Sequence, residues 1–239
     1  MDASLWQKDL LMEIDEVSGA REVFKRVEQA ARVLGFDMCG YGMRMPLPLS
    51  KPKTIIFSNF PPAWPARYHE ANYVSIDPTV AHGRRTAVPL VWTDDVFAGT
   101  PALWEEARAA GLRVGWCQSC FGANGVGGML SMARSSSPLS RIELESSELK
   151  MRSLVCVAHA ALSRAICAEF PAAPTHKLTG REVEILKWAA DGKTACDIAS
   201  ILLVSVDTVN FHIKNAVRKL NATNKTGAVV RAAMLGLLH

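Results

Sequence analysis

The spacing of hydrophobic residues predicts a helix and several short strands in the first part of the chain. Hydrophobic side chains recur at helical spacing over residues 22–34, and Gly35 follows where a helix C-cap is expected. Runs with strand character come next, at residues 38–44, 53–60 and 89–93, each bounded by Gly, Pro or Ser. These short strands indicate a sheet that shares its domain with helices.

Boundary residues predict two more helices and a hairpin. Residues 61–73 open with two prolines, which suit the first turn of a short helix. Residues 100–111 begin with a Thr N-cap followed by Pro, and they end with Gly. The runs 113–122 and 127–135 have strand character and are joined by the Gly-rich stretch 123–128, which is typical of a β-hairpin.

A long helix is predicted from Ser140 to Glu169. Ser140 and Glu143 form a capping-box pattern at its start. The helix has more apolar positions than one face of a domain needs, which fits either core packing or a helix-to-helix contact in a dimer. The stretch 170–175 contains two prolines, breaks the helical pattern and is typical of a linker.

The order of these elements predicts an α+β domain followed by an all-α domain. Residues 1–169 are expected to form an antiparallel sheet with helices on both faces, an α/β/α sandwich. Residues 170–176 are the predicted linker. Residues 177–239 contain helical patterns alone and are predicted to form a four-helix domain.

Composition narrows the class of protein. The chain has 239 residues, 49% of them hydrophobic, which is enough for a full core in one large and one small domain. Its acidic start does not resemble a signal peptide, and no apolar run reaches the roughly 18 residues that span a bilayer, so we expect a cytoplasmic protein without membrane contact. Six scattered cysteines are expected to be reduced thiols.

The positive charge is concentrated at the C-terminal end. From residue 176 onward there are nine Lys or Arg and five Asp or Glu, which accounts for the whole net charge of +4. The preceding residues balance to zero. Such an asymmetry is expected when a small terminal domain meets an anionic partner, although a solvated basic face is the more common explanation for a charge excess.

The C-terminal segment divides into four helices on physical grounds. Thr179, Thr194, Ser205 and Asn224 are placed as N-caps of successive helices. The predicted inward positions are Val183, Leu186 and Ala190 on the first helix, Ile198, Ile201 and Leu202 on the second, and Val209, Ile213, Ala216, Val217 and Leu220 on the third. Two helices joined by a short turn, with a basic excess, indicate a helix-turn-helix that binds double-stranded DNA.

The outward positions of the third helix carry groups that can recognise bases. Asn210 and Lys214 are four residues apart and share one face, where Asn can pair with adenine and Lys with guanine. The alternative is a basic helical bundle that binds protein. The predicted DNA-contacting residues are Lys193, Thr194, Ser205, Thr208, Asn210, Phe211, Lys214 and Lys225.

Residues 178–238 resemble the C-terminal domain of the LuxR family of transcription regulators. Three positions that are usually singled out in this domain correspond to Glu182, Leu186 and Gly192. The sequence departs from the family pattern at Gly180, which replaces a frequent proline, and at Asp197, which replaces a frequent glutamate. The matching segments are LTGRE, EILKW, DGKT, DIASIL, SVDTVNFHIKN, RKL, NK and GLL.

The N-terminal part decides which kind of regulator this is. A phosphoacceptor receiver needs an early acidic pair and an Asp at a strand end among alternating strands and helices, and residues 1–165 show no such order. Residues 20–165 are instead similar to the autoinducer-binding domain of LuxR-type quorum sensors. That resemblance rests on Trp64, Tyr68, Asp77-Pro78, Trp92, Gly111 and Gly115.

The resemblance implies an N-acyl homoserine lactone as ligand, with no cofactor and no bound metal. By it, Asp77 accepts the amide proton, Trp64 donates to the lactone carbonyl, and Tyr68 and Ser131 hold the acyl carbonyl. Trp92 is expected beside the lactone ring, Thr79 near Asp77, and Gly115 and Cys117 along the pocket wall. Phe60 stands where many relatives carry a tyrosine, so one hydrogen bond to the ligand is expected to be missing. The regulator is expected to act as a homodimer on an inverted-repeat operator.

Four alternatives to this interpretation remain at the sequence level. The aromatic residues and Asp77 have an ordinary role as core residues and a helix cap if the resemblance is set aside. Trp116-Cys117-Gln118-Ser119-Cys120 has the outline of a redox site, and Cys117-x-x-Cys120 with Cys156-x-x-His159 has ligands that suit zinc. An orphan receptor of the same architecture, which binds another small molecule or none, is the closest rival.

Strand geometry argues against a Cys117–Cys120 disulfide. In a strand over residues 113–121, Cys117 and Cys120 point to opposite faces of the sheet, and their Cα atoms lie about 10 Å apart, beyond the roughly 7 Å limit for a disulfide. The same alternation places Cys117 on the side of Gly115, so we expect Cys117 to face the acyl chain.

Overall fold

The computed structural model describes residues 3–45, 47–122, 126–135, 138–169 and 177–238. The predicted linker at residues 170–176 and the centre of the predicted Gly-rich turn, residues 123–125, lie outside the described part. The chain divides into two compact units, which we describe separately. The first holds the sheet and the helices up to residue 169, and the second holds the C-terminal helices.

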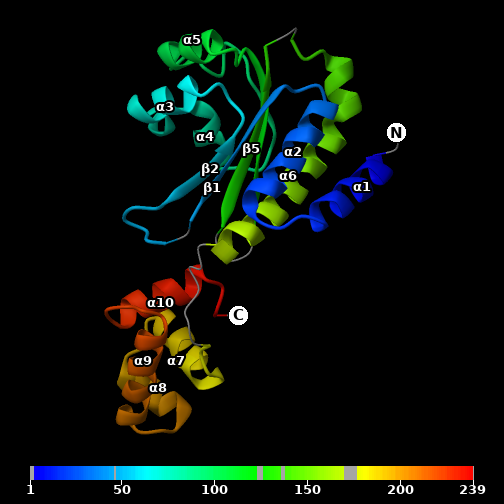
Figure 1. Cartoon of the computed structure of the whole chain (residues 1–239). Helices are drawn as coiled ribbons and strands as arrows, with labels where there is room; N and C mark the ends of the chain where they lie inside the picture. Colours follow the sequence, from blue (N-terminus) through cyan, green and yellow to red (C-terminus); the bar gives the residue numbers. More distant parts are fainter. Residues whose placement is uncertain (1–2, 46, 123–125, 136–137, 170–176, 239) are drawn as a thin grey trace. The chain divides into compact units, whose positions relative to one another are not determined.

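A five-stranded antiparallel sheet forms the centre of the first unit, in the order β2-β1-β5-β4-β3 (Figure 1). The predicted hairpin is present as the β4–β5 pair, and the predicted strands at 53–60 and 89–93 are shorter than expected. The strands are β1 (Met38–Arg44), β2 (Thr54–Ser58), β3 (Leu90–Val91), β4 (Val114–Phe121) and β5 (Gly127–Arg134).

Helices cover both faces of this sheet, as the predicted α/β/α sandwich requires (Figure 1). One face packs against α1 (Ala3–Asp15), α2 (Ala20–Val33) and α6 (Arg141–Glu169). The other face is covered by α3 (Ala63–Glu70), the short 3-10 turn η1 (Tyr73–Ser75), α4 (Pro78–Gly83) and α5 (Pro101–Ala109). The first helix, α1, was not predicted from the hydrophobic pattern.

Strand alternation separates two hydrophobic cores. Trp116, Leu130 and Met132 point to the side of α2 and α6 and belong to the larger core. Because neighbouring side chains in a strand point to opposite faces, Cys117 and Ser131 point to the side of α3 and α4. The smaller core on that second side is rich in aromatic rings.

Helix α6 is long and apolar enough to cross a membrane by length and composition. Its inward residues, among them Leu154, Ala158 and Leu162, are buried in the larger core against the sheet. The predicted capping box is present, because Ser140 Oγ accepts a hydrogen bond from the Glu143 amide at 3.1 Å. Glu143 also pairs with the buried Arg134 of β5, which fixes the start of the helix to the sheet. The apolar character of α6 is therefore that of a core helix.

The second unit contains four helices, α7 (Gly180–Ala190), α8 (Ala195–Leu202), α9 (Val206–Lys219) and α10 (Lys225–Met234). All four predicted N-caps accept backbone hydrogen bonds, and Thr179 and Thr194 form complete capping boxes. The prediction of an inward position was wrong for two residues, Ala190 and Ile201, which are exposed. Ile185 and Ala199 are buried in their place, because each helix turns its inner face about one position away from the assumed stripe.

An ion pair in the second unit joins α7 to α9. Glu182 is 3% exposed, and one of its carboxylate oxygens accepts hydrogen bonds from Lys219 Nζ at 2.7 Å and from the Thr179 amide at 2.8 Å. Burial acts to raise the pKa of Glu182, but the bonds from Lys219 and Thr179 outweigh it and lower that pKa below the ordinary value.

We predict that Glu182→Gln destabilises the second unit by about 2–4 kcal/mol, because the change leaves the Lys219 charge without its buried partner. The measurement is hydrogen exchange of the α7 and α9 amides. The matched control is Glu184→Gln, whose surface pair with Arg181 is worth at most about 1 kcal/mol. Equal effects of the two changes would contradict the assigned role of Glu182.

The same pair predicts a pH dependence. A carboxyl group whose pKa is lowered on folding stabilises the fold above its unfolded pKa, here near 4.5, and this stabilisation is lost as the pH falls through the lower folded value. Acid unfolding of the second unit below pH 4.5 is therefore expected to be less steep in Glu182→Gln than in the unmodified protein. An unchanged acid transition would contradict this account.

Candidate functional site

Three aromatic rings form one wall of the space between the sheet and the helices α3 and α4. Trp64 and Tyr68 are one turn apart on α3 and meet edge to face, with ring centroids 5.7 Å apart. Tyr73 stacks on Trp64 at 6.2 Å and meets Tyr68 at 5.9 Å. Trp64 and Tyr73 are buried, so this wall is apolar over most of its area.

Asp77 connects this wall to α4. It is the N-cap of α4 before Pro78, and its Oδ1 accepts hydrogen bonds from the Thr79 amide at 2.8 Å and the Thr79 hydroxyl at 2.7 Å. The Tyr68 hydroxyl donates to the other carboxylate oxygen, Oδ2, at 2.8 Å. A carboxylate offers about four acceptor positions. The described residues fill three of them, which leaves Asp77 able to accept one more donor.

The Tyr68 phenol is held in its protonated form. Burial, followed by the negative charge of Asp77 and the hydrogen bond to it, raises the pKa of Tyr68 above its ordinary value. Tyr68 therefore stays protonated, and its hydroxyl donates a hydrogen bond to Asp77. Its oxygen retains lone pairs that can accept a hydrogen bond from a bound molecule.

Trp92 follows strand β3 and lies flat against β4. A side chain at Gly115 would collide with the Trp92 ring, so glycine at this position is what allows the indole to approach the sheet. Trp92 Nε1 is buried and has no hydrogen-bond acceptor among the described residues. Burial raises the pKa of the Cys117 thiol and the nearby indole acts to lower it, although the indole and the thiol do not have the geometry of a hydrogen bond.

Trp104 offers a contrast to Trp92. Its Nε1 donates to Asp94 at 2.6 Å, and its ring stacks on Phe97 with centroids 4.3 Å apart. A buried donor without a partner costs about 1–3 kcal/mol. The unpaired Trp92 Nε1, unlike that of Trp104, is therefore the kind of group that a bound polar molecule would satisfy.

The sheet forms the floor of this space. Cys117 of β4 pairs in register with Ser131 of β5, and Ser131 pairs with Gly40 of β1, so the three residues form one row on the α3 and α4 side. Cys117 is fully buried and Ser131 is half-buried. Phe60 covers Gly40 so closely that an added Cβ would lie 2.8 Å from the Phe60 ring. The predicted ligand residues thus converge on one space, bounded by the sheet, α3, α4 and Trp92.

The redox alternative does not fit this geometry. Cys117 and Cys120 point to opposite faces of the sheet, and Cys120 packs against the larger core on the α6 side. Burial raises the pKa of the Cys117 thiol to about 12, whereas a redox thiol needs a lowered pKa. Both residues lie within a strand and not at a helix N-terminus.

The zinc alternative does not fit either. The predicted ligand set is split, because Cys117 faces away from α6, which carries Cys156 and His159. His159 is buried and its Nδ1 is 2.8 Å from the Tyr41 hydroxyl. Within the described residues, no group of three or more His, Cys, Asp or Glu side chains is placed to hold a metal ion.

A pocket of about 250 Å³ lies beside β3 and has Trp92 in its lining. Its lining includes the ion pair of Asp94 and Arg108, together with Arg113 and Leu139. None of Trp64, Tyr68, Asp77 and Ser131 lines it. We therefore place the candidate site in the aromatic space and not in this charged pocket.

Sequence reasoning missed several residues around the aromatic space. Tyr73 belongs to the wall, and its place five residues after Tyr68 is the only signal that hinted at it. Gly83, at the end of α4, and Met129, on the floor side of β5, were not singled out. Their proximity depends on the packing of α4 onto the sheet, which no local pattern reveals.

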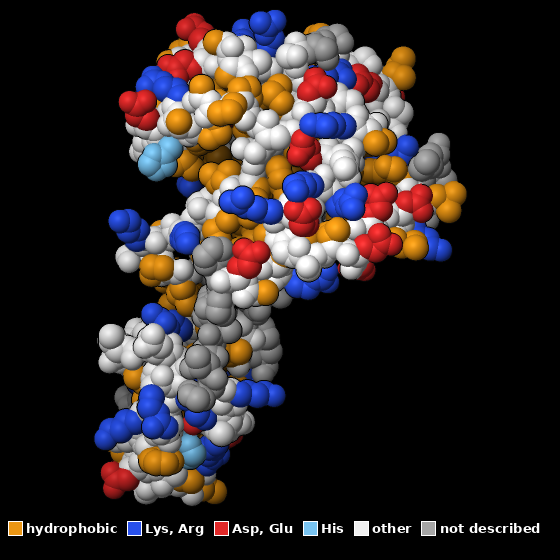
Figure 2. Space-filling model, in the orientation of Figure 1, with side chains coloured by type: hydrophobic (Ala, Val, Ile, Leu, Met, Phe, Trp, Pro, Cys, Tyr) orange, Lys and Arg blue, Asp and Glu red, His pale blue; other side chains and the backbone are white. Residues whose placement is uncertain are grey.

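The second unit presents a polar and basic surface on α9. Asn210, Phe211, Lys214 and Arg218 are exposed, and Phe211 is 61% exposed although it is a large apolar residue. Figure 2 shows Lys and Arg side chains gathered over this helix. The face that α9 turns outward is thus free to contact another molecule.

The remaining predicted DNA-contacting residues lie at helix beginnings. Lys193 and Thr194 precede α8 and are exposed, and Lys225 is the half-buried first residue of α10. The Ser205 hydroxyl caps α9 and lies 2.8 Å from the Thr208 hydroxyl. Backbone amides at these helix beginnings can bind phosphate groups.

Comparison with known proteins identifies both parts of the chain. Residues 19–165 match the family described as "Autoinducer binding domain". Residues 176–232 match the family described as "Bacterial regulatory proteins, luxR family". Together the two matches cover most of the chain.

Relatives match the chain over nearly their whole length. The chain is 44% identical over 236 residues to the transcriptional activator protein AnoR of Acinetobacter nosocomialis, covering 98% of this chain and 99% of AnoR. It is 38% identical to the quorum-sensing regulator RhlR of Pseudomonas aeruginosa, covering 98% of this chain and 97% of RhlR.

A solved structure agrees with these matches. The crystal structure of Escherichia coli SdiA superposes with a TM-score of 0.88 at 37% identity, covering 100% of both chains. A second structure, of SdiA in complex with octanoyl-rac-glycerol, gives a TM-score of 0.86 at 38% identity over 100% of this chain and 98% of that one. The family consists of transcription regulators and not of enzymes. The chain therefore belongs to the LuxR family of transcription regulators, with an autoinducer-binding domain followed by a LuxR-type helix-turn-helix domain.

Proposed function

We propose that this regulator binds an N-acyl homoserine lactone in residues 1–169 and double-stranded DNA through residues 177–239. It acts in the cytoplasm as a homodimer, and residues 170–176 link its two domains. The observation that carries the ligand assignment is the arrangement of Asp77, which has one open acceptor position at the edge of an apolar, aromatic space. No cofactor or metal takes part.

The polar groups of the site match those of the lactone one by one. The ligand amide N–H donates to Asp77, and Trp64 Nε1 donates to the lactone carbonyl. Ser131 donates to the acyl carbonyl, and Tyr68 joins it when its hydroxyl turns from Asp77 to the ligand. Thr79 keeps Asp77 oriented through two hydrogen bonds. Phe60 offers no hydroxyl, so the ligand is held by one hydrogen bond fewer than a tyrosine there would allow.

The rings and the floor receive the rest of the ligand. Trp92, seated on Gly115, packs beside the lactone ring, and Cys117 lies under the start of the acyl chain as a small apolar residue. A lactone acceptor near Trp92 Nε1 would satisfy the buried donor that has no partner among the described residues. Burial of an apolar chain against such a surface favours binding by about 25 cal/mol per Å².

The second domain binds DNA by placing α9 in the major groove. Asn210 and Lys214 contact base edges, and Phe211 lies next to them on the same exposed face. Lys193, Thr194, Ser205, Thr208 and Lys225 hold the phosphate backbone through side chains and backbone amides. A dimer with two-fold symmetry would select an inverted-repeat operator.

The exposed side of α6 supports the dimer. Ile142 and Leu149 are 80% and 70% exposed and are seven residues apart, which places them on one stripe of the helix. Large exposed apolar residues on one stripe are typical of an interface between chains. Sedimentation of the purified protein measures its oligomeric state directly.

An acylglycerol is the second candidate ligand class. The solved complex of SdiA with octanoyl-rac-glycerol shows that a relative with this fold takes an ester of that kind. An acylglycerol carries an acyl carbonyl and an apolar chain but lacks the amide N–H. Its glycerol hydroxyls can donate to Asp77 in place of that N–H, so a binding assay that compares the two ligand classes decides which donor the open acceptor position of Asp77 prefers.

We predict that Trp64→Phe weakens lactone binding about tenfold or more, because the carbonyl loses a buried donor worth about 1–3 kcal/mol. The measurement is the lactone-induced rise in melting temperature of the full-length protein. Trp104→Phe is the matched control, since Trp104 Nε1 already donates to Asp94. Equal losses in both variants would exclude Trp64 as a specific donor.

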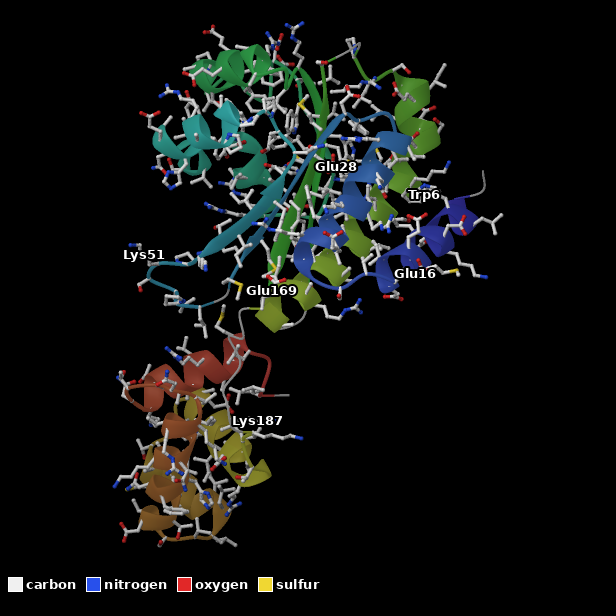
Figure 3. The ribbon with its side chains drawn as sticks, viewed as in Figure 1. Trp6, Glu16, Glu28, Lys51, Glu169 and Lys187 are labelled. Atoms are coloured by element: carbon white, nitrogen blue, oxygen red, sulfur yellow. The ribbon has the colours of Figure 1, made fainter. Side chains whose placement is uncertain are left out.

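We also predict that Lys214→Ala lowers affinity for the operator about tenfold and relaxes base preference at one position in each half-site. Lys225→Ala is expected to weaken binding to all sequences alike and to reduce the salt dependence by about one counterion per subunit. The control is Lys187→Ala, because Lys187 projects from α7 away from α9 (Figure 3). DNA binding that depends equally on Lys187 and Lys214 would contradict the assigned interface.

A further inference from the structure

One row of the sheet lies two residues beyond the row of Gly40, Ser131 and Cys117. In this second row, Gly42 of β1 pairs with Met129 of β5, and Met129 pairs with Ser119 of β4. Ile56 of β2 continues the row beyond Gly42. Because side chains repeat every two residues along a strand, this row faces the same side as Ser131 and Cys117.

Helix α4 covers the Ser119 side of this row. Gly83, the last residue of α4, packs so tightly on the sheet that a Cβ added there would lie 2.9 Å from Met129 Sδ and collide with Ser119 Oγ. Ser119 is 4% exposed. Asp77 caps the other end of the same helix. The covered space therefore begins at Asp77 and is closed where Gly83 meets Ser119 and Met129.

The Gly42 side of the row is open. A Cβ added at Gly42 would have no neighbour within 4 Å, and the adjoining Ile56 is 60% exposed. Figure 2 shows a hollow lined by hydrophobic side chains between the helices α3 and α4 and strand β2. An apolar slot thus leads from Met129 across Gly42 to Ile56 at the edge strand.

The distance between the two rows sets a chain length. Two residues of a strand advance about 7 Å, and an extended hydrocarbon chain advances about 1.25 Å per carbon. A chain whose carbonyl is held at Ser131 therefore reaches Met129 after about five further carbons. Shorter chains end before this row, whereas longer chains must change direction there.

We propose that Met129 and Gly42 determine acyl-chain length, with Met129 blocking a straight path and Gly42 providing an apolar slot through which longer chains turn toward Ile56. This inference rests on the proposed lactone function and adds to it the class of chain. Chains of about six carbons are fully enclosed, and chains of about ten or more carbons depend on the slot.

The first test fills the slot. Gly42→Val adds a side chain that strands tolerate well, and Gly42 does not have the positive φ that would make a side chain strained. We expect the Kd for dodecanoyl homoserine lactone to rise about tenfold or more, and the Kd for the hexanoyl lactone to change less than about twofold. Gly99→Val is the matched control, because a Cβ at Gly99 also meets nothing within 4 Å and lies outside the proposed path.

The second test removes the block. Met129→Ala opens the straight path, so affinity for the dodecanoyl lactone should rise relative to the hexanoyl lactone by about tenfold, even if Gly42→Val fails to fold. Each Kd is obtained by calorimetric titration of full-length protein.

The outcomes separate this inference from the function on which it rests. Binding of neither lactone to the unmodified protein would overturn both. If the unmodified protein binds both lactones, but Gly42→Val and Met129→Ala change the two Kd values equally or not at all, the assignment of Met129 and Gly42 is overturned while the proposed function stands. A loss confined to the longer chain in Gly42→Val, with Gly99→Val unchanged, would support it.

Discussion

The carboxylate of Asp77 is the interaction on which the ligand site depends. It caps α4 through Thr79 and accepts the Tyr68 hydroxyl, so one side chain fixes α3 and α4 relative to each other. The position of α4 then determines where Gly83 meets Ser119 and Met129, and hence where the covered space ends. The structural role of Asp77 as a helix cap and its proposed role toward a ligand amide are compatible, because its three bonds within the protein leave one acceptor position open.

The antiparallel sheet allows a rigid core and a ligand space to share the same strands. Alternation sends Trp116, Leu130 and Met132 into a closely packed core with α2 and α6, and it sends Cys117, Ser131 and Met129 to the other side. Gly40 and Gly115 let the rings of Phe60 and Trp92 approach the floor, and Gly42 leaves open space above it. The same alternation explains residues 115–120: Cys117 faces the side of α3 and α4, and Cys120 packs on the core side.

Local signals were enough to predict most of the fold. Capping residues such as Thr179 and Ser205, the hairpin pattern and the apolar stripe of α6 all act over a few residues, and the structure confirms them. Helix α1 was missed because its hydrophobic pattern is weak, and Ala190 and Ile201 were misplaced because a stripe fixes a helix face only to within about one position. Tyr73, Gly83 and Met129 become neighbours of the site only through tertiary packing, which local pattern does not encode.

The central claim is that a ligand amide donates to the open acceptor position of Asp77. Its most direct test compares, by calorimetric titration, an N-acyl homoserine lactone with the analogue that is methylated on the amide nitrogen. The account predicts that methylation weakens binding about tenfold to a hundredfold, because Asp77 then faces a methyl group in place of a donor. Equal affinity for the two compounds would show that Asp77 serves only as the cap of α4 and would contradict the proposed ligand site.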